Sequence, residues 1–161
     1  MNEKIIEKLQ EQFNDAIVST SEFRGELTVV VSKKQLVNIC KFLRDDDTLQ
    51  FDSLRDVCGA DYYRPEDRFE VIYNIYSLKN KFRIRLKVRV DEKDPVVPTV
   101  TGIWPTANWE EREAYDMYGI KFEGHPDLRR IYMPEDFEYY PLRKDFPLMG
   151  IPGSLPLPPK K

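Results

Sequence analysis

Residues 69–90 read FEVIYNIYSLKNKFRIRLKVRV, two runs in which apolar and polar side chains alternate. A period of two predicts two half-buried β-strands. If the strands pair about the Lys79-Asn80 step, three apolar pairs face one another: Val71 with Val88, Tyr73 with Leu86 and Ile75 with Ile84. On the other face Glu70 meets Arg89 and Asn74 meets Arg85. Both faces fit one register, so we predict an antiparallel hairpin whose loop has either two residues, 79–80, or four.

The segments before this hairpin show both helical and strand patterns. Helical spacing of apolar residues predicts a helix over 3–13. Ser32 and Gln35 form a capping-box pattern before a second helix over 33–44, which buries Leu36, Ile39, Cys40 and Leu43. Strands are predicted over 16–18 and 27–31, joined through Arg24-Gly25. Residues 49–60 are predicted to be extended, with Gly59 marking a bulge or a close approach of two segments.

The chain therefore divides into three parts. Residues 1–103 are expected to form an α+β domain, two helices packed on a mixed or antiparallel sheet of about five strands. A short capped helix and a turn follow in 104–125. Residues 126–161 hold eight of the twelve prolines and form an extended C-terminal arm. A chain cut near residue 100 is expected to fold but not to assemble with partners.

Composition excludes several classes of protein. With 25 Lys and Arg against 28 Asp and Glu the net charge is −3, which disfavours a general nucleic-acid binder. No apolar run approaches the ~20 residues of a membrane helix, and no signal peptide is visible. Two cysteines and one histidine are too few for a zinc site or an iron–sulfur cluster, so Cys40 and Cys58 are expected to be buried and reduced. No phosphate-binding glycine loop occurs.

One strand of the hairpin carries a row of five basic residues on one face: Lys81, Arg83, Arg85, Lys87 and Arg89. Such a row is most often solvated or paired within its own chain. Contact with a partner and contact with nucleic acid are the alternatives.

The segment WEEREAYDMYG, residues 109–119, predicts a helix over 109–118 with Asn108 as its N-cap, Glu111 completing a capping box and Gly119 ending it. Four side chains share one face of this helix: Trp109, Arg112, Glu113 and Asp116. Arg112 and Asp116 have the spacing of an ion pair. A catalytic or metal site that also uses Glu111 and His125 is disfavoured, because Glu111 and Glu113 point about 200° apart on a helix.

A longer pattern is more specific. Glu-Arg-Glu at 111–113, DMYGI at 116–120, HPDLRRI at 125–131 and PLRKD at 141–145 together resemble the signature of the thirty-kilodalton subunit, also called the C subunit, of respiratory complex I. The resemblance implies a non-redox structural subunit in the peripheral arm of the proton-translocating NADH:quinone oxidoreductase, helping to hold the quinone-reducing module. It implies no catalytic residue, metal or cofactor in this chain, while the complex carries FMN, iron–sulfur clusters and quinone.

The resemblance also implies partners and a location. The partners are other subunits of the peripheral arm, chiefly the D (forty-nine-kilodalton), B and I subunits, and membrane contact occurs only through the complex. In a bacterium the place is the cytoplasmic side of the inner (plasma) membrane. Alternatives are the equivalent subunit of a membrane-bound hydrogenase or of a dehydrogenase fed by ferredoxin or reduced F420, or an unrelated interaction or nucleic-acid-binding module.

We expect the helix and the arm to supply the partner interface, since aromatic and arginine side chains are typical interface anchors. A disordered tail is the alternative for the arm. The predicted interface residues are Trp109, Arg112, Glu113, Asp116, His125, Arg129, Arg130, Tyr132, Leu142, Arg143 and Phe146.

Overall fold

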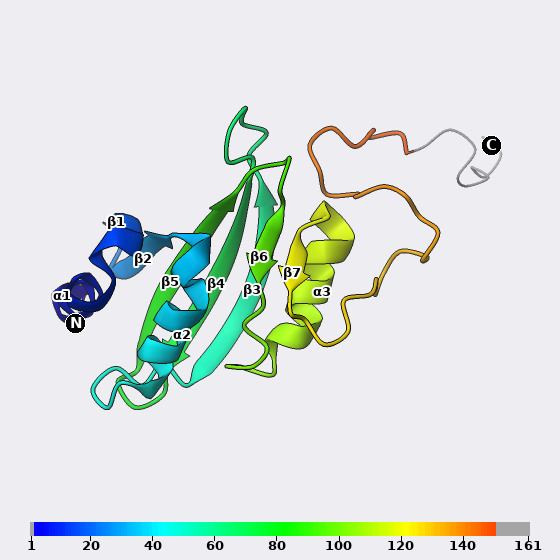
Figure 1. Cartoon of the computed structure of the whole chain (residues 1–161). Helices are drawn as coiled ribbons and strands as arrows, with labels where there is room; N and C mark the ends of the chain where they lie inside the picture. The colour runs from blue at the N-terminus through cyan, green and yellow to red at the C-terminus, as the bar shows by residue number, and fades with distance from the viewer. Residues whose placement is uncertain (1, 151–161) are drawn as a thin grey trace.

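The computed structural model describes residues 2–150 of the 161-residue chain, and residues 151–161 of the predicted arm lie outside the described part. Three α-helices and seven strands occur in it (Figure 1). Their order is α1 (Asn2–Phe13), β1 (Ile17–Phe23), β2 (Glu26–Val31), α2 (Leu36–Asp45), β3 (Ser53–Asp61), β4 (Phe69–Ser77), β5 (Phe82–Val90), β6 (Val96–Pro98), α3 (Ala107–Tyr118) and β7 (Lys121–Glu123). None of the helices in residues 2–150 combines the length and apolar character that crossing a membrane requires.

A mixed sheet of five strands forms the centre of the fold, as the sequence predicts, and the structure gives its strand order as β1-β2-β5-β4-β3. Strands β2 and β5 are parallel, while the other neighbours are antiparallel. Strands β6 and β7 pair as a separate parallel ribbon beside α3 (Figure 1). The α+β class is confirmed.

The predicted hairpin register is confirmed pair by pair, from Phe69 opposite Val90 to Ser77 opposite Phe82. Its loop is the four-residue form, 78–81, rather than the two-residue form. Lys81 takes a left-handed backbone conformation there, with φ of 51°. Because the parity is unchanged, every side chain keeps its predicted face.

One face of the sheet packs against the helices and forms the core. The four residues predicted to be buried in the second helix are all buried. Further along the chain the same core includes Val97 of β6, Ala114 of α3 and Phe122 of β7. Residues 104–125 therefore share a core with residues 1–103. A cut near residue 100 would remove β7 and α3 from this common core.

Both predicted capping boxes are absent. The Ser32 side chain makes no capping bond, and α2 begins at Leu36, after a single 3₁₀ turn over Lys33–Gln35. Helix α3 begins at Ala107, so Asn108 lies inside it. Thr106 already has helical φ and ψ angles, which extends the helix backwards past Asn108. The Glu111 carboxylate turns away from the helix start and accepts a bond from the Val100 N–H instead.

Gly59 of β3 marks a close approach, one of its two predicted roles. A Cβ atom at this position would lie 2.6 Å from Cδ2 of Tyr118 on α3. The irregularity in the pairing of β3 with β4 falls elsewhere, between Leu54 and Asp56. Gly59 thus sets the distance between α3 and the sheet.

Gly59→Ala is expected to lower the free energy of unfolding by about 1–3 kcal/mol, because the added methyl group overlaps the Tyr118 ring. Gly102→Ala is the matched control, since a Cβ there meets nothing within 4 Å. Urea unfolding of both variants measures the difference. Equal stability of the two variants would show that α3 can shift without cost.

Candidate functional site

The arm runs along α3 and back to the end of the sheet (Figure 1). Residues 126–150 contain no helix or strand. Their path is fixed by bonds to buried charged residues and to backbone carbonyl groups on α3, β3 and the segment before β4. We call these the three anchors of the arm: Asp116 with Arg112, Arg143 with the end of α3, and Arg68 with Asp61.

The first anchor is the fully buried carboxylate of Asp116. It accepts the backbone N–H groups of Ile131 at 3.0 Å, Tyr132 at 2.7 Å and Met133 at 3.0 Å, and the Arg130 guanidinium at 2.7 Å. Burial alone would raise the pKa of Asp116, but these donors together lower it. Asp116 therefore stays ionised and holds the arm mainly by its backbone, with Arg130 as the one side chain of the arm bonded to it within residues 2–150.

Arg112 supports the same turn from the next face of the helix. It is buried and donates to the carbonyl oxygens of Arg129 at 3.1 Å and Arg130 at 3.4 Å. Its guanidinium also lies over the Trp109 ring, 4.6 Å from the centroid. No ion pair joins Arg112 to Asp116 in residues 2–150, although their spacing permits one. Both side chains bond to the arm instead.

The second anchor lies at the end of α3. Arg143 donates to the carbonyl oxygen of Tyr118 at 2.7 Å and stacks on the Tyr140 ring. The Leu142 N–H donates to the carbonyl oxygen of Met117 at 3.2 Å. The last carbonyls of the helix are thus satisfied by the arm.

Gly119 makes this close contact possible. It ends α3 in the left-handed conformation, with φ of 76°, as its predicted C′ role requires. A Cβ atom here would come within 2.7 Å of the Tyr140 ring and of Arg143. The glycine is therefore required by its backbone conformation and by the packing of the arm.

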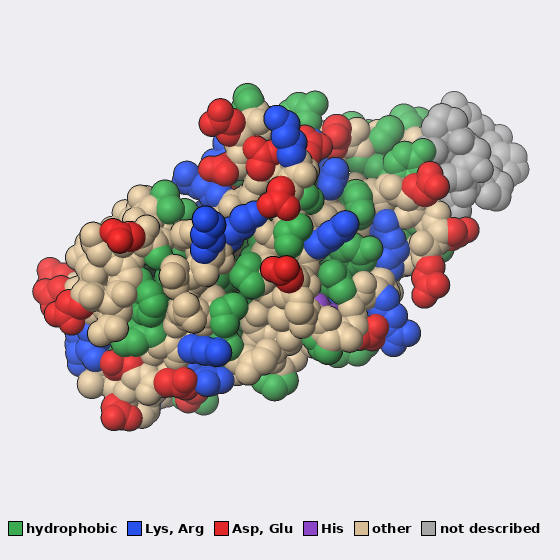
Figure 2. Space-filling view, viewed as in Figure 1, with side chains coloured by type: hydrophobic (Ala, Val, Ile, Leu, Met, Phe, Trp, Pro, Cys, Tyr) green, Lys and Arg blue, Asp and Glu red, His purple; other side chains and the backbone are tan. Residues whose placement is uncertain are grey.

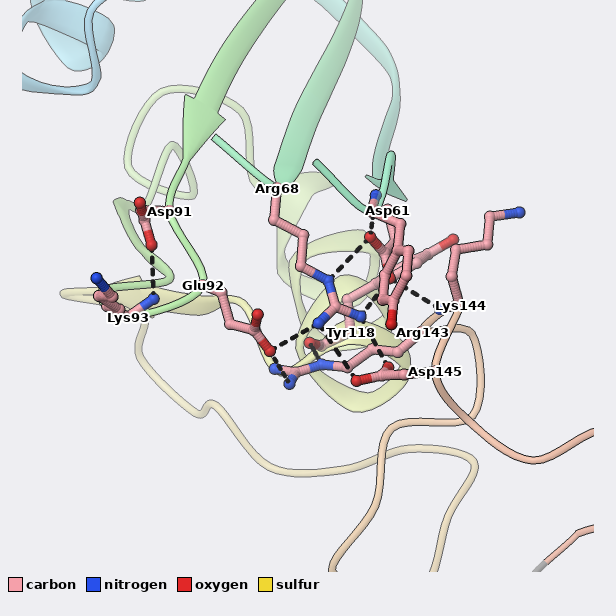
Figure 3. A network of polar contacts seen from close by, with 10 residues as sticks. Asp61, Arg68, Asp91, Glu92, Lys93, Tyr118, Arg143, Lys144 and Asp145 are labelled. Carbon is pink, nitrogen blue, oxygen red and sulfur yellow. Dashed lines mark hydrogen bonds and ion pairs between the residues drawn. The ribbon is translucent and has the colours of Figure 1, made fainter. Parts of the chain in front are cut away.

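The third anchor joins the arm to the end of the sheet (Figure 3). Buried Arg68 pairs with Asp61 at 2.8 Å, with Glu92 at 2.7 Å and with Asp145 of the arm at 2.7 Å. Asp61 also accepts the N–H of Lys144 at 2.8 Å. Burial would raise the pKa of Asp61, but Arg68 and the N–H groups of Lys144 and Tyr63 lower it.

Sequence reasoning missed Arg68, Asp61 and Glu92. One signal was available, because Asp61 pairs with Phe69 in the β3–β4 register, so Arg68 lies beside it. Asp145, the partner of Arg68 on the arm, is remote in sequence, and only the fold brings the two together.

His125 lies close to Glu111 inside the chain. Its Nδ1 accepts the Asp127 N–H at 3.0 Å, so Nε2 carries the proton and lies 3.1 Å from the Asn108 carbonyl oxygen. Nε2 is also 3.9 Å from Glu111 Oε2. The predicted role of a hydrogen-bonding loop residue therefore fits the geometry.

Glu111 is a fully buried acidic residue of α3. Burial raises the pKa of Glu111 to about 7, although bonds from Thr99 and the Val100 N–H act in the opposite direction. Glu113 is exposed on another side of α3 and meets only the Tyr132 hydroxyl, at 3.3 Å. Within residues 2–150 no group of three or more His, Cys, Asp or Glu side chains is arranged to hold a metal ion.

The two cysteines differ in burial. Cys40 is fully buried in the core, whereas Cys58 is half-buried. Burial raises the pKa of the Cys58 thiol to about 11. Both are free thiols.

The predicted interface residues fall into an inward group, an exposed group and the half-buried Phe146. Five are turned inward to fix the arm: Arg112, Asp116, His125, Arg130 and Arg143. Trp109 is 64% exposed and Tyr132 62% exposed, and Glu113, Arg129 and Leu142 also reach solvent. Phe146 is half-buried in a cluster with Phe137 and Tyr139. Figure 2 shows hydrophobic side chains along the outside of the arm.

Comparison with known proteins gives consistent matches. The family model for the 30 Kd subunit of respiratory-chain NADH dehydrogenase matches residues 29–152. The C 2 subunit of the NADH-quinone oxidoreductase of Rhizobium meliloti is 54% identical over 143 residues, covering 89% of this chain and 78% of that protein. The C subunit of the NADH-quinone oxidoreductase of Roseiflexus is 52% identical over 147 residues, covering 91% and 84%.

Two solved structures share the fold. The trypsin-resistant fragment (1-134) of Nqo5 has a TM-score of 0.64 and 34% identity, covering 80% of this chain and all of that chain. A chain of the membrane-bound sulfane sulfur reductase, an archaeal respiratory complex, has a TM-score of 0.77, covering 91% and 86%. At 23% identity the second likeness concerns the fold alone.

Asp116→Ala is expected to release the arm, because three N–H groups and a guanidinium lose their common acceptor. Loss of one partner from a buried charged contact costs about 3–5 kcal/mol. Trypsin should then cleave after Arg130 and Arg143 at least about tenfold faster, as mass spectrometry can measure. Glu113→Ala on the same helix is the control, and equal cleavage rates in the two variants would contradict the anchor.

Glu111 should make stability depend on pH. Its pKa is about 7 in the fold and about 4.3 in the unfolded chain. Between these values the folded chain binds more protons, so stability falls as pH rises, by up to about 4 kcal/mol. In Glu111→Gln this loss should vanish, while Glu113→Gln should keep it. Urea unfolding from about pH 5 to about pH 8 measures the free energy of unfolding at each pH. Parallel plots of this free energy against pH for wild type and Glu111→Gln would refute the assignment to Glu111.

Proposed function

Since this chain belongs to the family of the 30-kDa (C) subunit of respiratory complex I, the NADH-quinone oxidoreductase, we propose that it is a non-redox docking subunit of the peripheral arm of that enzyme. In this role it helps to hold the quinone-reducing module together. The electron-transfer chemistry belongs to other subunits, which bind FMN, iron–sulfur clusters and quinone.

The observation that carries this proposal is an arm held in one course by its own chain, with aromatic side chains facing outward. Its anchors include buried charged groups on α3 and at the end of the sheet, whereas Trp109 and Tyr132 are mostly exposed. A segment that is ordered before binding loses less conformational entropy on association. Exposed tryptophan and tyrosine side chains are the residue types that dominate binding energy at interfaces. The arm and α3 therefore have the form of a prepared docking surface.

We propose the D (forty-nine-kilodalton), B and I subunits as the partners of this surface. The place is then the cytoplasmic side of the inner membrane in a bacterium, with membrane contact only through the complex. NADH as the electron donor is supported by the names of relatives that are about half identical to this chain. The fold is shared with a subunit of a sulfur-reducing complex, so the fold alone does not specify the donor.

Trp109→Ala with Tyr132→Ala is expected to lower the amount of assembled complex and to leave turnover per assembled complex unchanged. Truncation of an interface hot spot costs about 2 kcal/mol or more, which is roughly a thirtyfold loss of affinity. The measurements are the yield of complex from solubilised membranes and the NADH:quinone activity per FMN.

Phe23→Ala is the matched control, because Phe23 is an aromatic residue 72% exposed on β1, outside the arm and α3. It should assemble normally. Normal assembly of the double variant with lost turnover would indicate a role in the chemistry. Normal assembly with normal turnover would show that these aromatic side chains do not dock.

A further inference from the structure

The face of the sheet opposite the core remains without a role in this proposal. On β5 it carries Arg83, Arg85, Lys87 and Arg89, which alternate with the core-facing residues of that strand. Arg55 of β3 lies near the same face, with its guanidinium 5.0 Å from the Tyr76 ring centroid. We call these five side chains and their surroundings the basic sheet face.

Acidic residues on this face neutralise only part of its charge. Glu26 pairs with Arg83 at 3.2 Å and with Arg85 at 3.0 Å. Buried Glu70 pairs with Lys87 at 3.1 Å. Together with Asp56, three carboxylates stand against five basic groups, which leaves a net charge of +2 in a chain whose net charge is −3.

Donor groups are left over as well. A guanidinium has five N–H donors. The exposed Arg83 donates one hydrogen bond within residues 2–150, to the Glu26 carboxylate. Arg55 donates no hydrogen bond to any group in residues 2–150, and Arg89 makes only an ion pair there, with Glu70 at 3.4 Å. The carboxylates, by contrast, are already engaged by these cations. The unpaired N–H donors and the excess positive charge on this face therefore suit an anionic ligand.

The face is also hollowed. A cavity of about 540 Å³ opens between the strands and is lined by charged and polar groups that include Glu26, Arg55, Asn74, Tyr76, Arg83 and Arg85. Cationic and polar side chains in a cavity of this kind suit a segment that carries acidic groups.

We propose that the basic sheet face is a second docking surface, and that its occupant is an extended acidic segment of a partner protein. Alternate residues of a strand stand about 6.8 Å apart. Acidic side chains at alternate positions of an extended segment have the same spacing, so several carboxylates meet the row on β5 at once. This surface is separate from the arm and its anchors.

The test uses the full chain and a fluorescein-labelled ten-residue peptide of alternating Glu and Thr, with binding followed by anisotropy. Binding should weaken as salt rises from about 50 mM to about 200 mM, because exposed charges are screened. Arg55→Glu with Arg83→Glu, both exposed positions, should weaken it at least about tenfold. Arg55→Gln with Arg83→Gln should give an intermediate loss, and thermal unfolding checks that both variants fold.

Lys41→Glu with Lys121→Glu is the matched control, since it makes the same change in charge at exposed positions of α2 and β7. It should change affinity less than about threefold. Equal losses in control and test variants would overturn the proposal, and so would absence of peptide binding at low salt. Tighter binding of a single-stranded RNA of equal charge, with the same sensitivity to the variants, would make the face a nucleic-acid site instead. Trp109→Ala with Tyr132→Ala should leave peptide binding unchanged, so failure of this surface and failure of the arm are distinguishable.

Discussion

A buried carboxylate is stable only when hydrogen-bond donors or cations compensate its charge. Asp116 accepts hydrogen bonds from three consecutive backbone N–H groups and one guanidinium. The helix that carries Asp116 is part of the common core. The irregular segment that supplies the donors therefore has a position as fixed as that of the helix. Arg112 and Arg143 bind carbonyl groups on the two sides of this point. Residues 126–150 contain no helix or strand that could fix their course in place of this carboxylate.

Much of the fold could be predicted from the sequence where a short period governs the pattern. The β4–β5 hairpin has two faces that must agree, so its register was determined even though its loop was left open. Capping was predicted wrongly for a physical reason. Glu111 fits a capping box by spacing, but as a buried residue it binds Val100 and Thr99, which no local pattern indicates.

Most residues of the site were predicted from the sequence, but most of their contacts were not. The shared face of Arg112 and Asp116 followed from helical geometry, and the surrounding motifs indicated an interface. Both side chains bond instead to backbone groups of an irregular segment, which has no period from which its course could be predicted. Arg68 and Asp61 were not predicted as site residues. Arg68 binds the arm through Asp145, which is more than seventy residues away in sequence. The outward-facing aromatic side chains remain a proposed interface.

The anchoring of residues 131–133 has a consequence for how such a subunit can change. Asp116 binds main-chain N–H groups, which every residue except proline possesses. The course of the arm there is insensitive to the side chains that it carries. Substitutions on its outer surface can therefore alter which partner it fits while the path of the chain stays the same.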